Sequence, residues 1–262
     1  MRLLKNSWLT FIILFCVVSH TTNAQSLPPR FEVGAHGSMF VYHGDLTTYK
    51  FGSRKTSKFG FGVYGSYRFN NFLSVRANFA KGKLEGDDEE YANPLHARKF
   101  NFNSPVTEFA GLLVWDVLGM GSKEISPNLF PYIIGGIGYS SLDIQRDYSE
   151  NTYGANHPYT LGLEEDIPQT LPSQLIVPMV GIGIRHYLTP KLTVNAEFMH
   201  RFTSTDYLDG FSQAADPSNN DSYYTFSAGL AYMFGERGGK GGGPNFKKGK
   251  GRKGKIECPV YE

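Results

Sequence analysis

Charged side chains recur inside segments that are otherwise apolar, and they raise the first question about chemistry. Each stands at an alternate position among glycine, small and aromatic residues, on a face that folding would remove from water. A buried charge is costly unless a partner of opposite sign accompanies it, so we expect ion pairs that stabilise the fold. A path for protons or ions is the alternative interpretation. The residues are Glu32, Arg68, Arg76, Glu108, Arg185, Glu197 and Arg201.

A second chemically distinctive region is the C-terminal segment 235–262. It contains nine glycines, eight Lys or Arg and three Glu residues, and a segment so poor in apolar residues cannot bury a core. We interpret it as a tether whose cations attract an acidic partner; a solvated terminus without a role and a contact with lipid head groups are the alternatives. Cys258 is the one cysteine after residue 25, so it is either a free thiol or forms a disulfide with another chain. The predicted partner-binding residues are Lys247, Lys248, Lys250, Arg252, Lys253, Lys255 and Cys258.

Catalytic and metal-binding patterns are weak in the rest of the chain. His200 and Ser204 stand near the end of one predicted strand, but four residues of strand separate them by about 13 Å, too far for a nucleophile and its base. The acidic segments 85–91 (EGDDEEY) and 205–210 (TDYLDG) lack the ligand spacing of an EF-hand loop, so we interpret them as solvated loops. The sequence therefore predicts no catalytic set, no bound metal and no cofactor.

The elements that position these residues are predicted to be β-strands, because apolar and polar residues alternate with a period of two. In the second of them, Phe59, Phe61 and Val63 alternate with small or polar residues. The alternation predicts an all-β fold without long helices. The eight predicted strand segments are 30–45, 58–70, 72–82, 106–116, 131–142, 174–188, 191–202 and 223–234.

Segment 174–188 is less regular than the others. Pro178 lacks the N–H that a central strand donates, so it predicts a bulge or a shifted register. Arg185 is expected on the polar face, opposite an apolar row. That row consists of Ile176, Val180, Ile182 and Ile184.

The connections between the predicted strands alternate between long and short. When long and short connections alternate in this way, all long loops lie at one end of the strands. This is the up-and-down plan of an outer-membrane β-barrel. A soluble barrel shares the alternation but points its apolar side chains inward; the charged faces here favour a lumen filled by paired side chains. The long loops are 44–57, 82–105, 145–173 and 205–221, the short turns are 70–71 and 189–191, and the link 117–129 is intermediate.

Residues 1–24 have the pattern of a secretory signal peptide, with two cations, an apolar core and a small residue, Ala24, at the expected cleavage site. The predicted organisation is therefore a signal peptide at 1–24, an outer-membrane barrel at 25–234 and a Gly/Lys-rich tail at 235–262. The tail carries a net charge of +5 and the barrel segment a net charge of −5. With eight strands and a periplasmic N-terminus, the disordered basic tail is expected in the periplasm.

Five stretches of the chain resemble the PorG-like outer-membrane barrels of Bacteroidetes. The resemblance implies a non-enzymatic component of the type IX secretion system, which also serves gliding motility. It further implies association with a periplasmic ring that contains a lipoprotein and its partner subunit. The stretches are VYHGDL (41–46), GKLEGDD (82–88), SPNLFPYIIGGIGY (126–139), TDYLDGFS (205–212) and DSYYTFSAGLAYMF (221–234).

The sequence thus leads to one main hypothesis and two alternatives. The main hypothesis is an eight-stranded barrel in the outer membrane that anchors or assembles the secretion machinery through its periplasmic turns and tail, with outer-membrane lipid as its surroundings and no nucleic acid as a partner. One alternative is an enzyme that modifies outer-membrane lipid. The other is a surface adhesin or binding barrel that uses the four long loops.

Overall fold

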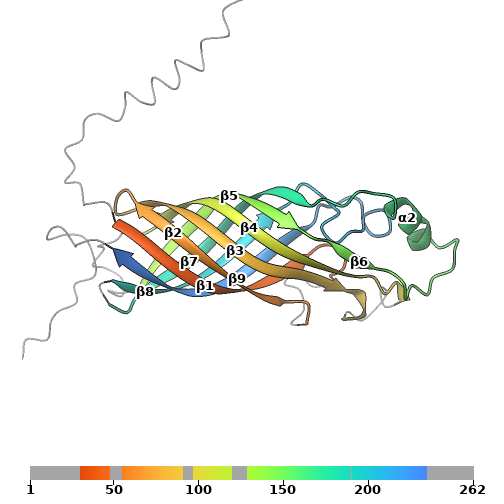
Figure 1. Ribbon diagram of the computed structural model, residues 1–262, viewed down its shortest axis with the longest axis horizontal. Helices are drawn as coiled ribbons and strands as arrows, with labels where there is room; N and C mark the ends of the chain where they lie inside the picture. Colours follow the sequence, from red (N-terminus) through yellow and green to blue (C-terminus); the bar gives the residue numbers. More distant parts are fainter. Residues whose placement is uncertain (1–29, 48–54, 91–96, 120–128, 190, 235–262) are drawn as a thin grey trace, which may run out of the picture.

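Eight long antiparallel strands form a closed β-barrel, as the sequence predicted (Figure 1). The computed structural model describes residues 30–47, 55–90, 97–119, 129–189 and 191–234. Each long strand pairs with the next one along the chain, and β9 pairs with β1 to close the barrel. The strands are β1 (Arg30–His43), β2 (Lys58–Arg68), β3 (Leu73–Asp87), β4 (Asn101–Asp116), β5 (Leu129–Leu142), β7 (Gln174–Tyr187), β8 (Leu192–Phe202) and β9 (Ser222–Phe234).

The outer wall of the barrel is apolar. On β2, Phe59 is 75% exposed, and on β7 Ile176 and Ile182 are 67% and 62% exposed, whereas Arg185 is buried. This is the reverse of a soluble barrel, and it confirms the predicted direction of the alternating faces. Large apolar side chains exposed around the whole wall form the surface that a transmembrane barrel presents to lipid.

Three prolines lie within strands without interrupting them. Pro178 pairs with Ile137 in an unbroken register, so the predicted bulge at this position is wrong. The pairing of β7 with β8 begins one residue later, at Met179. Pro105 and Pro131 likewise lie one residue beyond the end of the β4–β5 pairing. A residue that cannot donate a ladder hydrogen bond is tolerated where a ladder ends.

Two of the predicted long loops contain regular structure. The hairpin of β3 and β4 extends to Asp87 and Asn101, well into the segment 82–105 that the sequence analysis assigned to a loop, and β4 also pairs there with a short strand, β6 (Gln145–Asp147). Outward positions of β3 change from Phe79 to charged residues beyond it, so this hairpin rises above the apolar wall.

The helical structure of the described residues lies at the same end of the barrel. It consists of a 3₁₀ turn, η1 (Asp88–Glu90), and α2 (Pro158–Asp166), which lies at the far tip of the barrel in Figure 1. The N-terminus of α2 is capped by His157, whose side chain accepts a hydrogen bond from the backbone of Tyr159. No helix in the described ranges is both long and apolar enough to cross a bilayer.

The opposite end of the barrel has tight turns. Between β2 and β3, the Asn70 side chain accepts hydrogen bonds from the backbone N–H groups of Phe72 and Leu73, both at 2.8 Å. Between β7 and β8, the Thr189 hydroxyl accepts the N–H of Leu192 at 2.9 Å. Both turns use a short polar side chain in place of a backbone acceptor, and both chain ends of the barrel lie at this end.

The interior consists of three layers. Phe130, Tyr187 and Met233 form a small apolar cluster at the turn end. Ionised side chains occupy the middle. A larger apolar cluster extends from the loop end, where the β8–β9 connection contributes the fully buried Leu208 and Phe211, down to Val114 and Tyr132 among the ionised side chains. The loop end is therefore closed by a folded cap, formed by the described parts of the connections together with η1, β6 and α2.

Candidate functional site

The middle layer contains all seven charged residues singled out in the sequence. At its turn side, Asp116 accepts a hydrogen bond from Arg68 at 2.7 Å and another from Arg185 at 2.8 Å. Arg185 also lies 3.7 Å from Glu32, which accepts the hydroxyl of Tyr64 at 3.0 Å. One carboxylate thus bridges two arginines that come from opposite sides of the barrel.

Two further ion pairs lie nearer the loop end. Arg201 binds Glu108 with two parallel hydrogen bonds of 2.7 and 2.9 Å, the geometry that gives the strongest arginine–carboxylate pairs. Arg76 donates to Glu197 at 2.6 Å. Glu197 also accepts the hydroxyl of Tyr132. The four arginines of this layer face four carboxylates, so its formal charges balance.

Asp116 was not among the residues singled out in the sequence. The signal for it was present, because Asp116 is eight residues after Glu108 on the same strand and therefore on the same face. The middle layer has few spare ionisable groups and its members are held by hydrogen bonds across the barrel. Such an arrangement stabilises a closed cylinder.

The cap is held by buried aspartates that bind backbone N–H groups. Asp166, the last residue of α2, accepts the N–H groups of Ser212, Gln213 and Ala214 at 2.9–3.1 Å. It also accepts the hydroxyl of Tyr207 at 3.0 Å. This single carboxylate therefore fixes the β8–β9 connection against α2.

An ion pair joins the other connections of the cap. Arg98, which lies between η1 and β4, binds Asp88 with hydrogen bonds of 2.7 and 2.9 Å. Its remaining N–H groups donate to the carbonyls of Asp45 and Ala214. Burial acts to lower the pKa of Arg98, but its ion pair with Asp88 outweighs burial and raises the pKa above its usual value.

The most unusual contact in the cap places one hydroxyl between two carboxylates. Tyr42 lies 2.7 Å from an oxygen of Asp209 and 2.6 Å from an oxygen of Asp221. A phenol has one proton to donate, so both contacts are hydrogen bonds when one of the carboxyl groups carries a proton. Burial raises the pKa of Asp209 and of Asp221 well above the usual range, and the neighbouring charge of Asp209 raises that of Asp221 further.

These contacts correct the interpretation of both acidic segments as solvated loops. Asp88 and Asp209 are fully buried, because each is used to bind other parts of the cap. The spacing of acidic residues gave no indication of partners that lie far away in sequence. In the part of the chain that the structure describes, no three His, Cys, Asp or Glu side chains are arranged to hold a metal ion.

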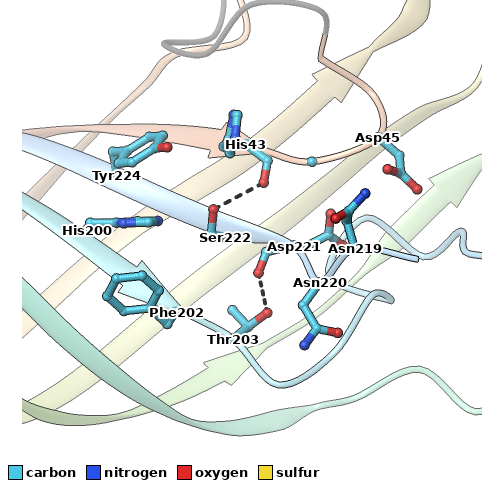
Figure 2. Close-up of a pocket in the computed structure, with 11 residues that line it drawn as sticks. His43, Asp45, His200, Phe202, Thr203, Asn219, Asn220, Asp221, Ser222 and Tyr224 are labelled. Atoms are coloured by element: carbon cyan, nitrogen blue, oxygen red, sulfur yellow. Dashed lines mark hydrogen bonds between the residues drawn. The ribbon is translucent and has the colours of Figure 1, made fainter. Parts of the chain in front are cut away.

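A pocket of about 550 Å³ lies on the outside of the barrel at the loop end. We call it the rim pocket, and Figure 2 shows its side chains. His200 and Tyr224 are opposite each other on β8 and β9, and Ser222 is opposite His43 and Phe202. The rim pocket is lined by these five residues and by Gly44, Asp45, Thr203, Asn219, Asn220 and Asp221.

The rim pocket does not assemble the pair considered in the sequence. Ser204, a neighbour of His200 along the chain, does not line it, and the Nε2 atom of His200 is buried without a hydrogen-bond partner among the described residues. Tertiary structure instead brings the hydroxyl group of Ser222 to the rim pocket, where it donates to the carbonyl of His43 at 3.5 Å. A nucleophile needs a base within hydrogen-bonding distance, and these contacts do not provide one.

The predicted tail site lies outside the described residues. Lys247, Lys248, Lys250 and the other basic residues up to Cys258 belong to 235–262, and the predicted signal peptide belongs to 1–29. Their interpretation therefore stays a prediction.

A family model described as "Domain of unknown function (DUF6089)" matches residues 7–239 of the chain. The chain belongs to this family. The match includes the whole barrel from β1 to β9 and extends beyond it at both ends. No curated protein matches the chain.

Solved outer-membrane proteins resemble the DUF6089 barrel in fold at low sequence identity. Ail of Yersinia pestis, solved in complex with the heparin analogue sucrose octasulfate, has 12% identity and a TM-score of 0.38 over 80% of this chain and 99% of its own. OprG of Pseudomonas aeruginosa has 12% identity and a TM-score of 0.42 over 79% and 96%. A major outer membrane protein of Thermus thermophilus has 12% identity and a TM-score of 0.45 over 79% and 100%.

Proposed function

We propose that this protein is a non-enzymatic outer-membrane anchor that assembles a periplasmic ring complex of the type IX secretion machinery. The observation that carries its membrane placement is the pairing of an apolar outer wall with an ionised interior. Exposed residues such as Phe59 and Ile182 would be costly in water, and lipid removes that cost.

The filled interior supports an anchoring role over transport through the barrel. Arg185 and Tyr132 are almost completely buried, Tyr132 as a member of the larger apolar cluster, and the smaller apolar cluster lies on the turn side of them. A small solute would have to displace paired charges and packed aromatic side chains. The protein therefore acts through its two ends rather than through its lumen.

The turn end is the proposed site of assembly. Its tight turns are fixed by Asn70 and Thr189, so they form a rigid surface beside the ends of the barrel. The chain leaves β9 at this end and continues into the basic segment 235–262. The proposed partners are a periplasmic ring lipoprotein and its associated subunits, which the cations of the segment attract and which Cys258 can bind through an interchain disulfide.

The proposal is tested by replacing the segment rather than only removing it. A chain in which 236–262 is deleted, and one in which the segment is replaced by a Gly/Ser sequence of equal length, are compared for secretion and for insertion of the barrel. Loss of secretion in both, with the barrel still in the membrane, is the expected result. Normal secretion in both chains contradicts the tether.

The covalent version of the contact has its own test. A band of higher mass on a non-reducing gel is expected for the natural chain and is expected to disappear in Cys258→Ser. If the two chains give the same bands, Cys258 forms no interchain disulfide. If a Cys258→Ala chain still secretes, the tether acts through the attraction of its cations and needs no disulfide.

A second function is favoured by the folded cap. Loops that only connect strands need no buried ion pair, yet Arg98 and Asp166 bind connections from different parts of the chain. A rigid outer surface is what a surface-binding barrel requires. Replacing residues 149–156, which lie ahead of α2, with Gly/Ser residues should abolish attachment to a binding surface under this function but leave secretion unchanged.

A further inference from the structure

The rim pocket is where the apolar wall meets the polar cap. Its lower half belongs to the outward faces of β8 and β9, with Phe202 46% exposed, and its upper half belongs to the connections before β9. Figure 2 shows the rings of His200, Phe202 and Tyr224 on one side and the side chains of Asp45 and Asn220 on the other. A ligand here would contact an aromatic surface and polar groups at the same time.

The aromatic side of the rim pocket is compact. The ring of His200 lies 4.2 Å from the ring of Phe202 and 4.5 Å from that of Tyr224, measured between ring centroids. The faces of such rings carry partial negative charge and attract C–H groups that are slightly positive. A saturated ring with several hydroxyl substituents has such C–H groups on its faces.

The polar side of the rim pocket can bind hydroxyl groups. Asn219 uses its amide N–H groups for Asp216 and Ser218, and those bonds do not engage its carbonyl oxygen. The side-chain amide of Asn220 makes no hydrogen bond to any described residue, so it can both donate and accept.

The charge of the rim pocket selects against anionic ligands. Among the described residues no lysine or arginine lines it, whereas the carboxyl group of Asp45 does; the oxygens of Asp221 are used inside the cap by Tyr42 and Leu208. A phosphate or carboxylate would meet the Asp45 carboxyl group there without a described cation to bind it. The combination of an aromatic wall, amide groups and acidic groups fits a neutral polyhydroxylated ligand.

We propose that the rim pocket binds the sugar head group of a glycolipid in the outer leaflet of the membrane. The acyl chains would lie along the apolar wall below it, where Phe198 and Phe226 are neighbours at a ring-centroid distance of 4.9 Å. The proposal depends on the membrane placement made above, but it does not depend on the secretion role. A sugar in solution has the same head-group chemistry, and the experiment separates the two sources.

The test uses the full-length mature protein in detergent and native mass spectrometry. Digalactosyl diacylglycerol, phosphatidylglycerol with the same acyl chains, and the free disaccharide are the three probes. We expect the glycolipid to bind at least about tenfold more tightly than either of the other two, a difference of about 1.4 kcal/mol. Equal retention of the two lipids overturns the proposal, and equal binding of the free disaccharide overturns its lipid part.

Paired variants assign the binding to the rim pocket. Phe202→Ala and Asn220→Ala should each reduce glycolipid binding several-fold. Phe109→Ala, which removes an exposed ring on β4, and Gln213→Ala, in the same connection as Asn220, should not. Unchanged binding in the first pair contradicts the site. If the mature protein were soluble without detergent, the membrane placement itself would be wrong, which is a different result from a failure of the pocket.

Discussion

The middle layer and the cap both bury carboxylates, but they stabilise them in different ways. In the middle layer the partners are side chains on other strands, as in the contact of Asp116 with Arg68 and Arg185. In the cap the partners are mostly backbone N–H groups of connections, as in the three that Asp166 accepts. The ladder already satisfies backbone groups in the strands, whereas the connections must find other acceptors.

The carboxylates have a different role in each region. In the middle layer the carboxylates neutralise arginines in an interior that is closed at both ends, so removing one leaves an unpaired charge. In the cap they hold irregular backbone, so removing one opens a segment that can reach water. The first change should affect the whole barrel and the second a part of it.

The largest effect is expected for Asp116→Ala. The substitution leaves Arg68 and Arg185 buried without their shared partner, and breaking a buried pair in this way costs about 3–5 kcal/mol. Urea unfolding in lipid vesicles, followed by the fluorescence of tryptophan, measures the free energy of unfolding. The exposed Asp143→Ala is the control. A loss below about 1 kcal/mol would show that the middle layer tolerates unpaired arginines by hydration.

A smaller and local effect is expected for Asp166→Ala. Loss of the acceptor for Ser212, Gln213 and Ala214 leaves N–H groups whose burial costs about 1–3 kcal/mol each, so the β8–β9 connection should open rather than remain closed. Hydrogen exchange and limited proteolysis of that connection should increase strongly, with little change in global unfolding. Glu165→Ala, an exposed neighbour on α2, should change neither. Equal sensitivity of both variants would contradict the role of Asp166.

The pair of acids around Tyr42 should make the cap depend on pH. Because the pKa values of Asp209 and Asp221 are raised by folding, the folded state binds more protons than the unfolded one. Their contribution is full below a pH of about 4, where unfolded aspartate titrates, and is lost as the pH rises through the raised pKa. Cap opening, measured by proteolysis, should therefore be easier at pH 8 than at pH 5.

Asp209→Asn should remove much of that pH dependence. An amide at this position can accept the N–H of Phe211, as Asp209 does at 2.8 Å, and can donate to the oxygen of Tyr42. The N–H of the amide thus takes the place of the proton that Asp209 and Asp221 share. Tyr42→Phe should instead weaken the cap at high pH, because two carboxylates then face each other. Identical pH profiles for Asp209→Asn and the natural chain would rule out the shared proton.

The smallest effect is expected at the surface of the cap. Lys55 and Glu90 form an ion pair of 2.7 Å, but the Lys55 side chain is 74% exposed. Water and salt screen such pairs, so Lys55→Ala should leave the stability of the cap unchanged within error. A loss as large as that of Asp166→Ala would show that cap stability is set by surface charge instead of by buried acceptors.

The barrel was largely predictable because its pattern is local. Alternation assigned Arg185 and Glu108 to the interior and Ile176 to the wall, and it required no knowledge of which strands pair. Where the prediction failed, at Pro178, the missing information was the position of a neighbouring strand's end. The continuation of β3 and β4 was missed because charged outward residues above the wall resemble a polar loop.

The cap could not be predicted to the same extent. Asp88 and Arg98 are ten residues apart, but Arg98 also contacts the carbonyl of Ala214, 116 residues away. Neither the spacing of these residues nor their type indicates such partners. The rim pocket was missed for the same reason, since His43, His200 and Ser222 come from three strands.

The sequence by itself determined which side chains face the interior and which face outward, since a strand turns alternate residues to opposite faces whatever it pairs with. It also predicted the order of the strands, because long and short connections alternate as they do in an up-and-down barrel. Only the tertiary structure decided that Asp116 joins two arginines, that aspartates of the connections are buried and that two histidines meet at the rim. Those contacts depend on the distances between strands after the barrel closes, and no local pattern contains them.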